Sequence, residues 1–165
     1  MKKIIKIMIF GRPGGGKSTF AYALHKRTGI PLHHLDKHFY ESNWVQRDYQ
    51  IQQSMVQQEA WIIDGNSTKS LEISYKHADV VIYFNYPRHI CYWRMFKRWL
   101  RKNKAIDDRA AGCTETINWG LLSYMWSFEN RVKDSVAALK NAYPYVVFHE
   151  VHSDAELKKL YTNLD

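Results

Sequence analysis

A glycine-rich stretch near the start of the chain has the spacing of a phosphate-binding loop, or P-loop. Residues 11–18 read Gly-Arg-Pro-Gly-Gly-Gly-Lys-Ser and satisfy every fixed position of the pattern G-x-x-x-x-G-K-[ST]. Glycines let backbone N–H groups approach phosphate oxygens without a Cβ in the way, and the first turn of a following helix supplies further donors. The pattern therefore predicts nucleotide phosphate binding by Gly11, Pro13, Gly14, Gly15, Gly16, Lys17, Ser18 and Thr19.

Three side chains have predicted roles in metal-assisted phosphate chemistry. Lys17 brings a positive charge to the β- and γ-phosphates and is a predicted catalytic residue, while the Ser18 hydroxyl can ligate Mg²⁺. Asp64 ends the apolar run Trp61–Asp64, where a carboxylate is well placed to hold Mg²⁺ through water. The alternative for Asp64 is a surface carboxylate that opens a turn with Gly65. ATP and Mg²⁺ are the cofactors expected from this set.

A basic segment follows the middle of the chain, and its members are Arg88, Arg94, Lys97, Arg98, Arg101, Lys102, Lys104 and Arg109. On a helix, Arg94, Arg98 and Arg101 share one face, and guanidinium groups there can hold phosphate oxygens through two bonds. We predict that Arg94 and Arg98 stabilise charge during phosphoryl transfer and that Arg109 binds the nucleotide. Residues 101–113 are polar and are expected to form a small lid that excludes water.

Two alternatives for this basic segment stay open. One is a solvated basic helix whose tryptophan and phenylalanine side packs on the core. The other is a nucleic-acid-binding stripe in which Trp93 and Trp99 stack on bases. Helical spacing favours inward packing of both tryptophans.

The acceptor of the phosphoryl group is expected beside Asp36, which ends a second predicted strand. A carboxylate there can take a proton from an acceptor hydroxyl or bind a sugar, so Asp36 is predicted to be both catalytic and acceptor-binding. Arg47 and Asn66 are the other predicted acceptor-binding residues, within or next to an acceptor-side segment of residues 36–60. The alternative for Asp36 is a turn cap.

The elements that position these residues alternate along the chain. Apolar runs at 4–10, 31–36, 61–64, 80–84 and 145–151 are typical of strands buried in a parallel sheet. Helices are expected at 17–27, 48–60, 89–102, within 117–139 and at 154–164. Five strands alternating with helices predict a single three-layer α/β/α domain over residues 1–165, with ligands bound beyond the carboxyl ends of the strands.

Several motifs together resemble the adenylate kinase and nucleotide-kinase family over nearly the whole chain. They are the P-loop, "ADVVIYFNYPR" at 78–88, and the arginine-rich helix with its following loop. "HLDKHFY", "WIIDGN" and "YPRHICYWRMFKRWL" resemble more closely the DNA topology modulation protein branch of that family. The resemblance implies a P-loop kinase fold with the P-loop strand at its centre, flanked by Asp36 and Asp64, and with Arg94 and Arg98 near the start of a lid.

One three-residue segment departs from the family pattern. Asn66-Ser67-Thr68 stand where conventional nucleotide kinases have Phe-Pro-Arg, which helps to bind the acceptor phosphate. AMP is therefore not implied as the acceptor.

Composition restricts the partners and the setting of the chain. Its 165 residues carry a formal net charge of +8, which favours anionic partners. Cys91 and Cys113 supply neither a disulfide framework nor a paired metal knuckle. No apolar run approaches the roughly 18 residues of a membrane span, so we expect a cytoplasmic protein without membrane contact.

Two functions are consistent with the sequence. The first is an ATP- and Mg²⁺-dependent kinase that transfers the γ-phosphate to a nucleotide or a small hydroxyl acceptor; a GTPase is disfavoured because no Asn-Lys-x-Asp motif is present. The second is a nucleotide-dependent regulator that binds DNA or RNA with little or no turnover.

Overall fold

The computed structural model describes residues 5–35, 50–65, 70–101 and 119–164, with Arg101 described by its backbone alone. Five strands form one sheet in the order β2-β3-β1-β4-β5, and every neighbouring pair is parallel. The strands are β1 (Lys6–Gly11), β2 (Leu32–His34), β3 (Trp61–Asp64), β4 (Val80–Phe84) and β5 (Val147–Val151). The predicted parallel α/β fold is therefore confirmed, with the P-loop strand β1 at the centre of the sheet.

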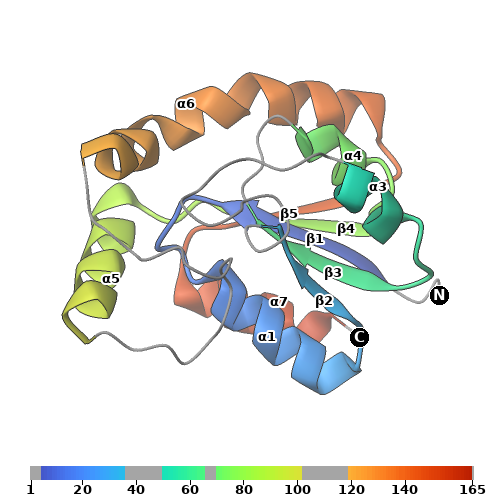
Figure 1. Ribbon diagram of the computed structural model, residues 1–165, viewed down its shortest axis with the longest axis horizontal. Helices are drawn as coiled ribbons and strands as arrows, with labels where there is room; N and C mark the ends of the chain where they lie inside the picture. The colour runs from blue at the N-terminus through green and yellow to red at the C-terminus, as the bar shows by residue number, and fades with distance from the viewer. Residues whose placement is uncertain (1–4, 36–49, 66–69, 102–118, 165) are drawn as a thin grey trace.

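Helices cover both faces of this sheet and make the third layer (Figure 1). They are α1 (Lys17–Thr28), α3 (Gln50–Val56), α4 (Leu71–Tyr75), α5 (Arg88–Arg101), α6 (Trp119–Ala142) and α7 (Asp154–Asn163). Helices α1 and α7 lie on one face, whereas α3, α4 and α6 lie on the other. Helix α5 stands at the end of the sheet to which the carboxyl ends of the strands point.

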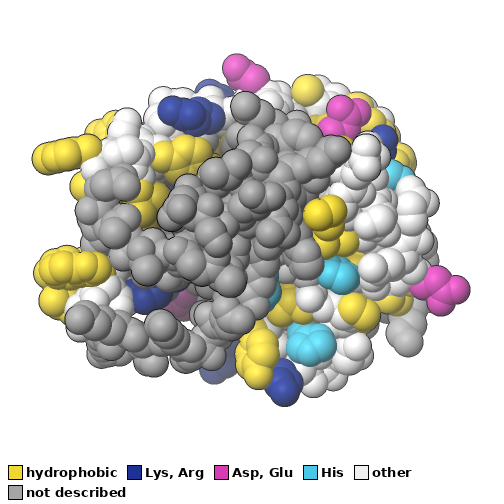
Figure 2. Space-filling view, in the orientation of Figure 1, with side chains coloured by type: hydrophobic (Ala, Val, Ile, Leu, Met, Phe, Trp, Pro, Cys, Tyr) yellow, Lys and Arg dark blue, Asp and Glu magenta, His cyan; other side chains and the backbone are white. Residues whose placement is uncertain are grey.

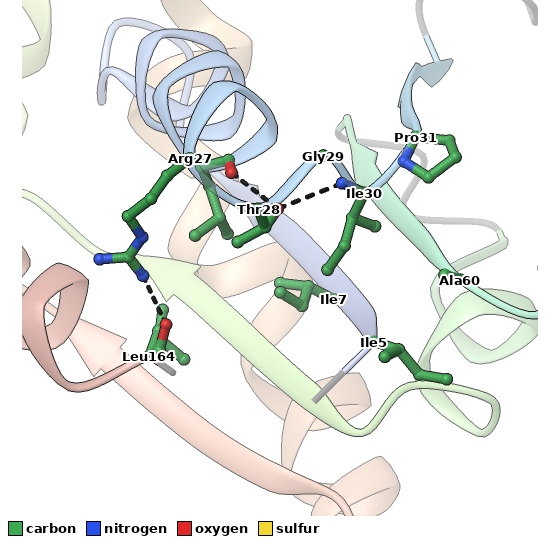
Figure 3. A pocket seen from close by; sticks show the side chains of 10 residues that line it. Ile5, Ile7, Arg27, Thr28, Gly29, Ile30, Pro31, Ala60 and Leu164 are labelled. Atoms are coloured by element: carbon green, nitrogen blue, oxygen red, sulfur yellow. Dashed lines mark hydrogen bonds between the residues drawn. The ribbon is translucent and has the colours of Figure 1, made fainter. Parts of the chain in front are cut away.

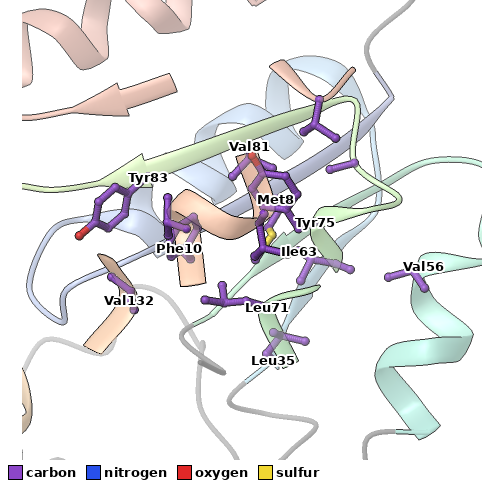
Figure 4. Packing of buried hydrophobic residues seen from close by; sticks show 14 of the residues in the cluster. Met8, Phe10, Leu35, Val56, Ile63, Leu71, Tyr75, Val81, Tyr83 and Val132 are labelled. Carbon is purple, nitrogen blue, oxygen red and sulfur yellow. The ribbon is translucent and has the colours of Figure 1, made fainter. Parts of the chain in front are cut away.

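The alternation of side chains along β1 divides the core in two. Met8 and Phe10 point into the cluster beneath α3, α4 and α6, whereas Ile7 and Ile9 point into the cluster beneath α1 and α7. In the first cluster the ring of Phe10 stacks on Tyr83 of β4 at a centroid distance of 4.8 Å (Figure 4). Both faces of the central strand are thus buried, which is why its sequence is almost continuously apolar.

Helix α5 does not pack as the sequence predicted. Its buried residues Cys91 and Met95 face the core, whereas Trp93, Phe96 and Trp99 are exposed. The expectation that the two tryptophans pack inward is therefore wrong. The core-facing side of α5 is set by Cys91 and Met95, four residues apart, and Trp93 lies between them in sequence and so on another side of the helix.

A pocket of about 380 Å³ opens at the amino ends of the strands, away from the P-loop (Figure 3). Its lining is mainly apolar and includes Ile5, Ile7, Leu24, Ile30 and Leu164. The Arg27 guanidinium at its border donates to the carbonyl oxygens of Tyr161 and Leu164 and so holds the end of α7.

The polar groups at this border thus serve the packing of α7 on α1.

Among the described residues, no helix is long and apolar enough to cross a membrane.

Candidate functional site

The P-loop connects β1 to α1 and its backbone is shaped by close neighbours. Gly14 has φ of 80°, and a Cβ on it would lie 2.4 Å from the carbonyl oxygen of Cys91 on α5. A Cβ on Gly11 would lie 2.4 Å from the carbonyl oxygen of Phe84 on β4. Only glycine fits at these two positions, so the loop is held tightly against α5 and β4.

The loop ends at the first turn of α1, whose N-terminal N–H groups receive no side-chain cap. Uncapped N–H groups at a helix N-terminus are donors for an anion. Lys17 is the first residue of this helix and is largely buried, and its Nζ donates to the carbonyl oxygen of Arg12 at 3.2 Å. Ser18 is half-buried and Thr19 is exposed beside it. The predicted phosphate-binding residues therefore form one continuous turn.

Arg12, within the loop, is a fully buried arginine whose guanidinium points toward α6. Its Nε donates to the carbonyl oxygen of Met125 at 2.9 Å, and its Nη1 donates to that of Tyr86 at 2.7 Å. Nη2 lies 3.5 Å from the carboxylate of Glu129. The side chain of Arg12 therefore ties the P-loop to α6.

Arg94 of α5 contacts the P-loop from the other side. Its Nη1 donates to the carbonyl oxygen of Gly15 at 3.0 Å, and its Nη2 donates to both carboxylate oxygens of Asp154 at 2.7 and 2.8 Å. The guanidinium also stacks on the ring of Tyr86, 4.6 Å from its centroid. Arg94 therefore lies beside the predicted phosphate site and contacts the first residue of α7.

These contacts set the protonation of the group. Burial disfavours the charged form of Arg94, but its hydrogen bond to Asp154 and the charge of that carboxylate outweigh burial and raise the pKa of the guanidinium. The hydrogen bond from Arg94 lowers the pKa of Asp154. Burial, followed by the hydrogen bond to Asp154, raises the pKa of the Tyr86 hydroxyl. A charged arginine, an ionised carboxylate and a neutral phenol thus stand beside the loop at neutral pH.

Arg98 lies one helical turn beyond Arg94 on α5 and is half-buried. The predicted sharing of one helix face by these two arginines fits the observed helix. Arg101 ends α5, and its side chain lies outside the described residues, as does the predicted lid beyond it.

Asp64 ends β3, directly beside the central strand. It pairs with Ile9 in the parallel register, and the following Gly65 N–H donates to the carbonyl oxygen of Ile9 at 3.2 Å. The carboxylate is almost fully buried, which disfavours its interpretation as a surface turn residue. Its Oδ2 lies 3.0 Å from Nδ1 of His34 on β2.

The second carboxylate oxygen of Asp64, Oδ1, bears on whether a metal ion fits here. Oδ1 is buried and has no hydrogen-bond partner among the described residues. Buried carboxylate oxygens are costly to leave unsatisfied, and Mg²⁺ prefers such oxygens together with water and phosphate. In the described ranges no group of three or more acidic, histidine or cysteine side chains could hold a metal by itself. The residues present therefore fit a metal ion that is held partly by the protein and partly by the oxygens of a bound phosphate.

The remaining predicted site residues cannot be placed. Asp36, Arg47, Asn66 and Arg109 lie outside the described residues, as do residues 102–113 of the predicted lid and 36–49 of the predicted acceptor segment. The structure brings together the P-loop with Arg94 and sets Asp64 on the neighbouring strand.

Three contributors were missed from sequence. His34 is absent from the predicted site residues, although its position at the end of a strand neighbouring Asp64 could have signalled the pair. Tyr86 and Asp154, which hold Arg94, follow the ends of β4 and β5. Location after parallel strands is the one signal that could have found them, because strand ends converge on one edge.

Comparison with known proteins gives structural matches alone: no protein-family model matches the chain, and no curated protein matches it. Deoxyadenosine kinase from M. mycoides with bound dATP aligns with a TM-score of 0.59 and 17% identity over 97% of this chain and 98% of that one. Shikimate kinase from Acinetobacter baumannii in complex with shikimate aligns with a TM-score of 0.59 and 10% identity over 98% and 90%.

A second deoxyadenosine kinase structure from M. mycoides, with bound dCTP, aligns with a TM-score of 0.52 and 16% identity over 96% and 97%. Identities this low carry the fold and nothing finer. The chain therefore has the fold of the small P-loop kinases, with an all-parallel sheet of order 2-3-1-4-5.

Proposed function

We propose that this protein is an ATP- and Mg²⁺-dependent phosphotransferase that moves the γ-phosphate of ATP to a nucleotide, a nucleoside or another small hydroxyl acceptor. The supporting observation is the complete P-loop after the central strand, with the Arg94 guanidinium bonded to its backbone at Gly15. An arginine beside a phosphate cradle is the arrangement that neutralises a transferring phosphoryl group.

The roles of the chain's own groups follow from their places. Backbone N–H groups of the loop and Lys17 hold the β- and γ-phosphates, and Arg94 with Arg98 neutralises the charge that spreads over the γ-phosphate oxygens. Ser18 and Asp64 would hold Mg²⁺, which neutralises the β- and γ-phosphate charge when bound. His34 fixes the orientation of the Asp64 carboxylate.

The transfer itself is a displacement at phosphorus. The acceptor hydroxyl oxygen forms a bond to the γ-phosphorus as the bond from that phosphorus to the β-phosphate oxygen breaks, and ADP leaves. We assign the acceptor's proton to Asp36, with Arg47 and Asn66 as acceptor contacts and Arg109 as a nucleotide contact. We also propose that residues 101–113 act as a lid within one 1–165 domain.

The acceptor class is open to a direct test. The fold is shared with kinases whose structures hold dATP, dCTP or shikimate, so the acceptor panel should span deoxynucleosides, nucleoside monophosphates and hydroxylated acids. Purified protein with Mg²⁺–ATP should release one ADP for each molecule of one acceptor that is phosphorylated. A coupled assay measures the ADP, and mass spectrometry identifies the phosphorylated acceptor. Absence of acceptor-dependent ADP across the panel, in protein that binds ATP by calorimetry, would refute the phosphotransferase assignment.

One observation favours a second candidate function, nucleotide-dependent binding of DNA or RNA, as in the resemblance to the DNA topology modulation branch. Trp93 and Trp99 are exposed on α5 and not buried in the core. This candidate predicts nucleic acid affinity that falls with salt and little acceptor-dependent ADP release.

A further inference from the structure

The outer face of α5 carries a row of exposed aromatic rings. The side chains of Trp93, Phe96 and Trp99 are 56%, 44% and 49% exposed. The ring centroids of Trp93 and Phe96 are 6.2 Å apart at an interplanar angle of 26°, and those of Phe96 and Trp99 are 6.0 Å apart at 30°. These three residues, called the aromatic row below, therefore present successive rings that are close to parallel.

The aromatic row is not a by-product of core packing. The residues of α5 that contribute to the core are Cys91 and Met95, on the opposite face of the helix. Leu100 extends the exposed apolar face with an exposed fraction of 59%. In Figure 2 hydrophobic side chains project from the left edge of the molecule, where Figure 1 places α5 and the start of α6. Contiguous exposed apolar surface of this kind is typical of binding sites, whereas apolar side chains scattered singly over a surface are not.

Positive charge is interleaved with these rings. Helix α5 contains five basic residues and no acidic one, the five being Arg88, Arg94, Lys97, Arg98 and Arg101. The Lys97 ammonium lies 5.1 Å above the ring of Trp93, and the Arg88 guanidinium lies 4.6 Å above the exposed ring of Trp126 on α6. The partner that suits this face therefore has planar rings and carries negative charge.

We propose that the aromatic row of α5 binds single-stranded nucleic acid, with bases stacked on its rings and phosphates near Lys97 and Arg88. Stacking on aromatic side chains needs bases whose faces are free, which single strands have and duplexes do not. A second copy of this chain is disfavoured as occupant, because a symmetric contact would bring two helices of like charge together. The inference deepens the second candidate function, for which it names the surface and the strand form.

The experiment measures binding without an acceptor, both with and without Mg²⁺–ATP, so its outcome is independent of phosphotransfer. Fluorescence anisotropy of a labelled dT20 oligonucleotide should show binding to the wild-type protein that weakens as salt rises from 50 to 200 mM. Trp93→Ala and Trp99→Ala should each weaken the affinity roughly 5- to 100-fold, because each removes one stacking platform. Trp99→Tyr should restore most of it, and Lys97→Gln should reduce the salt dependence.

Tyr22→Ala supplies the matched control, since Tyr22 is an exposed aromatic residue paired with Lys26 on a different helix, α1. It should leave the dT20 affinity within about twofold. Circular dichroism melts of every variant check that these surface changes leave the fold intact.

Three results would overturn the proposal. If the wild-type protein does not bind dT20 at 50 mM salt, either with or without Mg²⁺–ATP, the second candidate function fails with it. If it binds but Trp93→Ala and Trp99→Ala do not weaken binding, the nucleic acid lies elsewhere and only the α5 surface is refuted. If these variants instead abolish self-association, or binding to vesicles of anionic phospholipid, while dT20 affinity is unchanged, the row serves a dimer or a membrane surface.

Discussion

The guanidinium of Arg94 and the carboxylate of Asp154 form a doubly hydrogen-bonded ion pair beside the P-loop. The pair joins α5 to the first residue of α7, and Tyr86 adds a third bond through its hydroxyl to the same carboxylate at 2.9 Å. Arg94 is thereby held in the position from which it donates to the carbonyl oxygen of Gly15. The ion pair therefore fixes the place of this guanidinium beside the predicted phosphate site.

Asp154→Asn is expected to lower stability by about 0.5–1 kcal/mol at neutral pH, a small cost because Asp154 is mostly exposed. The pKa of Asp154 is lowered in the folded state, so its stabilisation is present above the ordinary carboxyl pKa of 3.8 and is lost as the pH falls through the lower folded value. Urea unfolding between pH 2 and 7 should therefore show the two proteins converging at the acid end. Asp134→Asn, at an exposed acidic residue of α6, is the control.

A constant difference between wild type and Asp154→Asn down to pH 2 would show that charge is not the origin of the effect. If the difference in unfolding free energy instead grows as the pH falls, its pH dependence is opposite to the expected one and contradicts the ion pair.

Arg12→Met is expected to cost roughly 1–3 kcal/mol in the free energy of unfolding, because it removes the two buried hydrogen bonds from the guanidinium to the carbonyl oxygens of Met125 and Tyr86. Methionine keeps much of the side-chain volume, so the change isolates the hydrogen bonds. Glu129→Gln is the matched control and should cost less than about 1 kcal/mol, since that contact is long and half exposed. Equal losses for both variants in urea titrations would contradict the assignment.

Gly14→Ala and Gly29→Ala test the close approach of the P-loop to α5. Both glycines have positive φ, 80° and 72°, but a Cβ on Gly14 would meet the Cys91 carbonyl at 2.4 Å, whereas a Cβ on Gly29 would meet nothing within 4 Å. Gly29→Ala should therefore cost about 1 kcal/mol from backbone strain alone. Gly14→Ala should cost clearly more in thermal melts and should also weaken ATP binding in calorimetry, and comparable costs at the two sites would refute the steric argument.

Lys17→Ala is expected to lower turnover with the identified acceptor by roughly 10²–10³, the loss typical of one preorganised donor to the transition state. The Nζ of Lys17 donates to the carbonyl oxygen of Arg12 within its own loop, and circular dichroism melts should show whether the variant stays folded. Lys26→Ala, an exposed lysine of the same helix, should leave kcat unchanged. Turnover of Lys17→Ala at the wild-type rate would show that the loop does not take part in catalysis.

The strands and the glycine-rich turn between β1 and α1 could be predicted from sequence because each shows a local pattern. "VVIYF" at 80–84 is apolar throughout, as a strand buried on both faces requires, and the observed β4 has these bounds. The turn was recognised from the fixed spacing of its glycines, lysine and serine, although the close contacts that require Gly11 and Gly14 come from distant elements. Helix α4, at five residues, is too short to show a helical period and was not predicted.

What escaped prediction depends on residues distant in sequence. Arg94 and Asp154 are sixty positions apart, and Arg12 and Met125 are 113 apart, so no local pattern connects them. The orientation of Trp93 was predicted wrongly because aromatic spacing was read as a core face. Cys91 and Met95 form the face of α5 that packs in the core.

The buried guanidinium of Arg12 fastens the nucleotide loop to the backbone of α6 next to Trp126. Under the proposed function, a displacement of that loop on nucleotide binding is therefore expected to reach α6 at Met125. Trp126 follows Met125 in this helix and carries the Arg88 guanidinium over its ring. Its fluorescence is therefore expected to respond to nucleotide binding without any added dye.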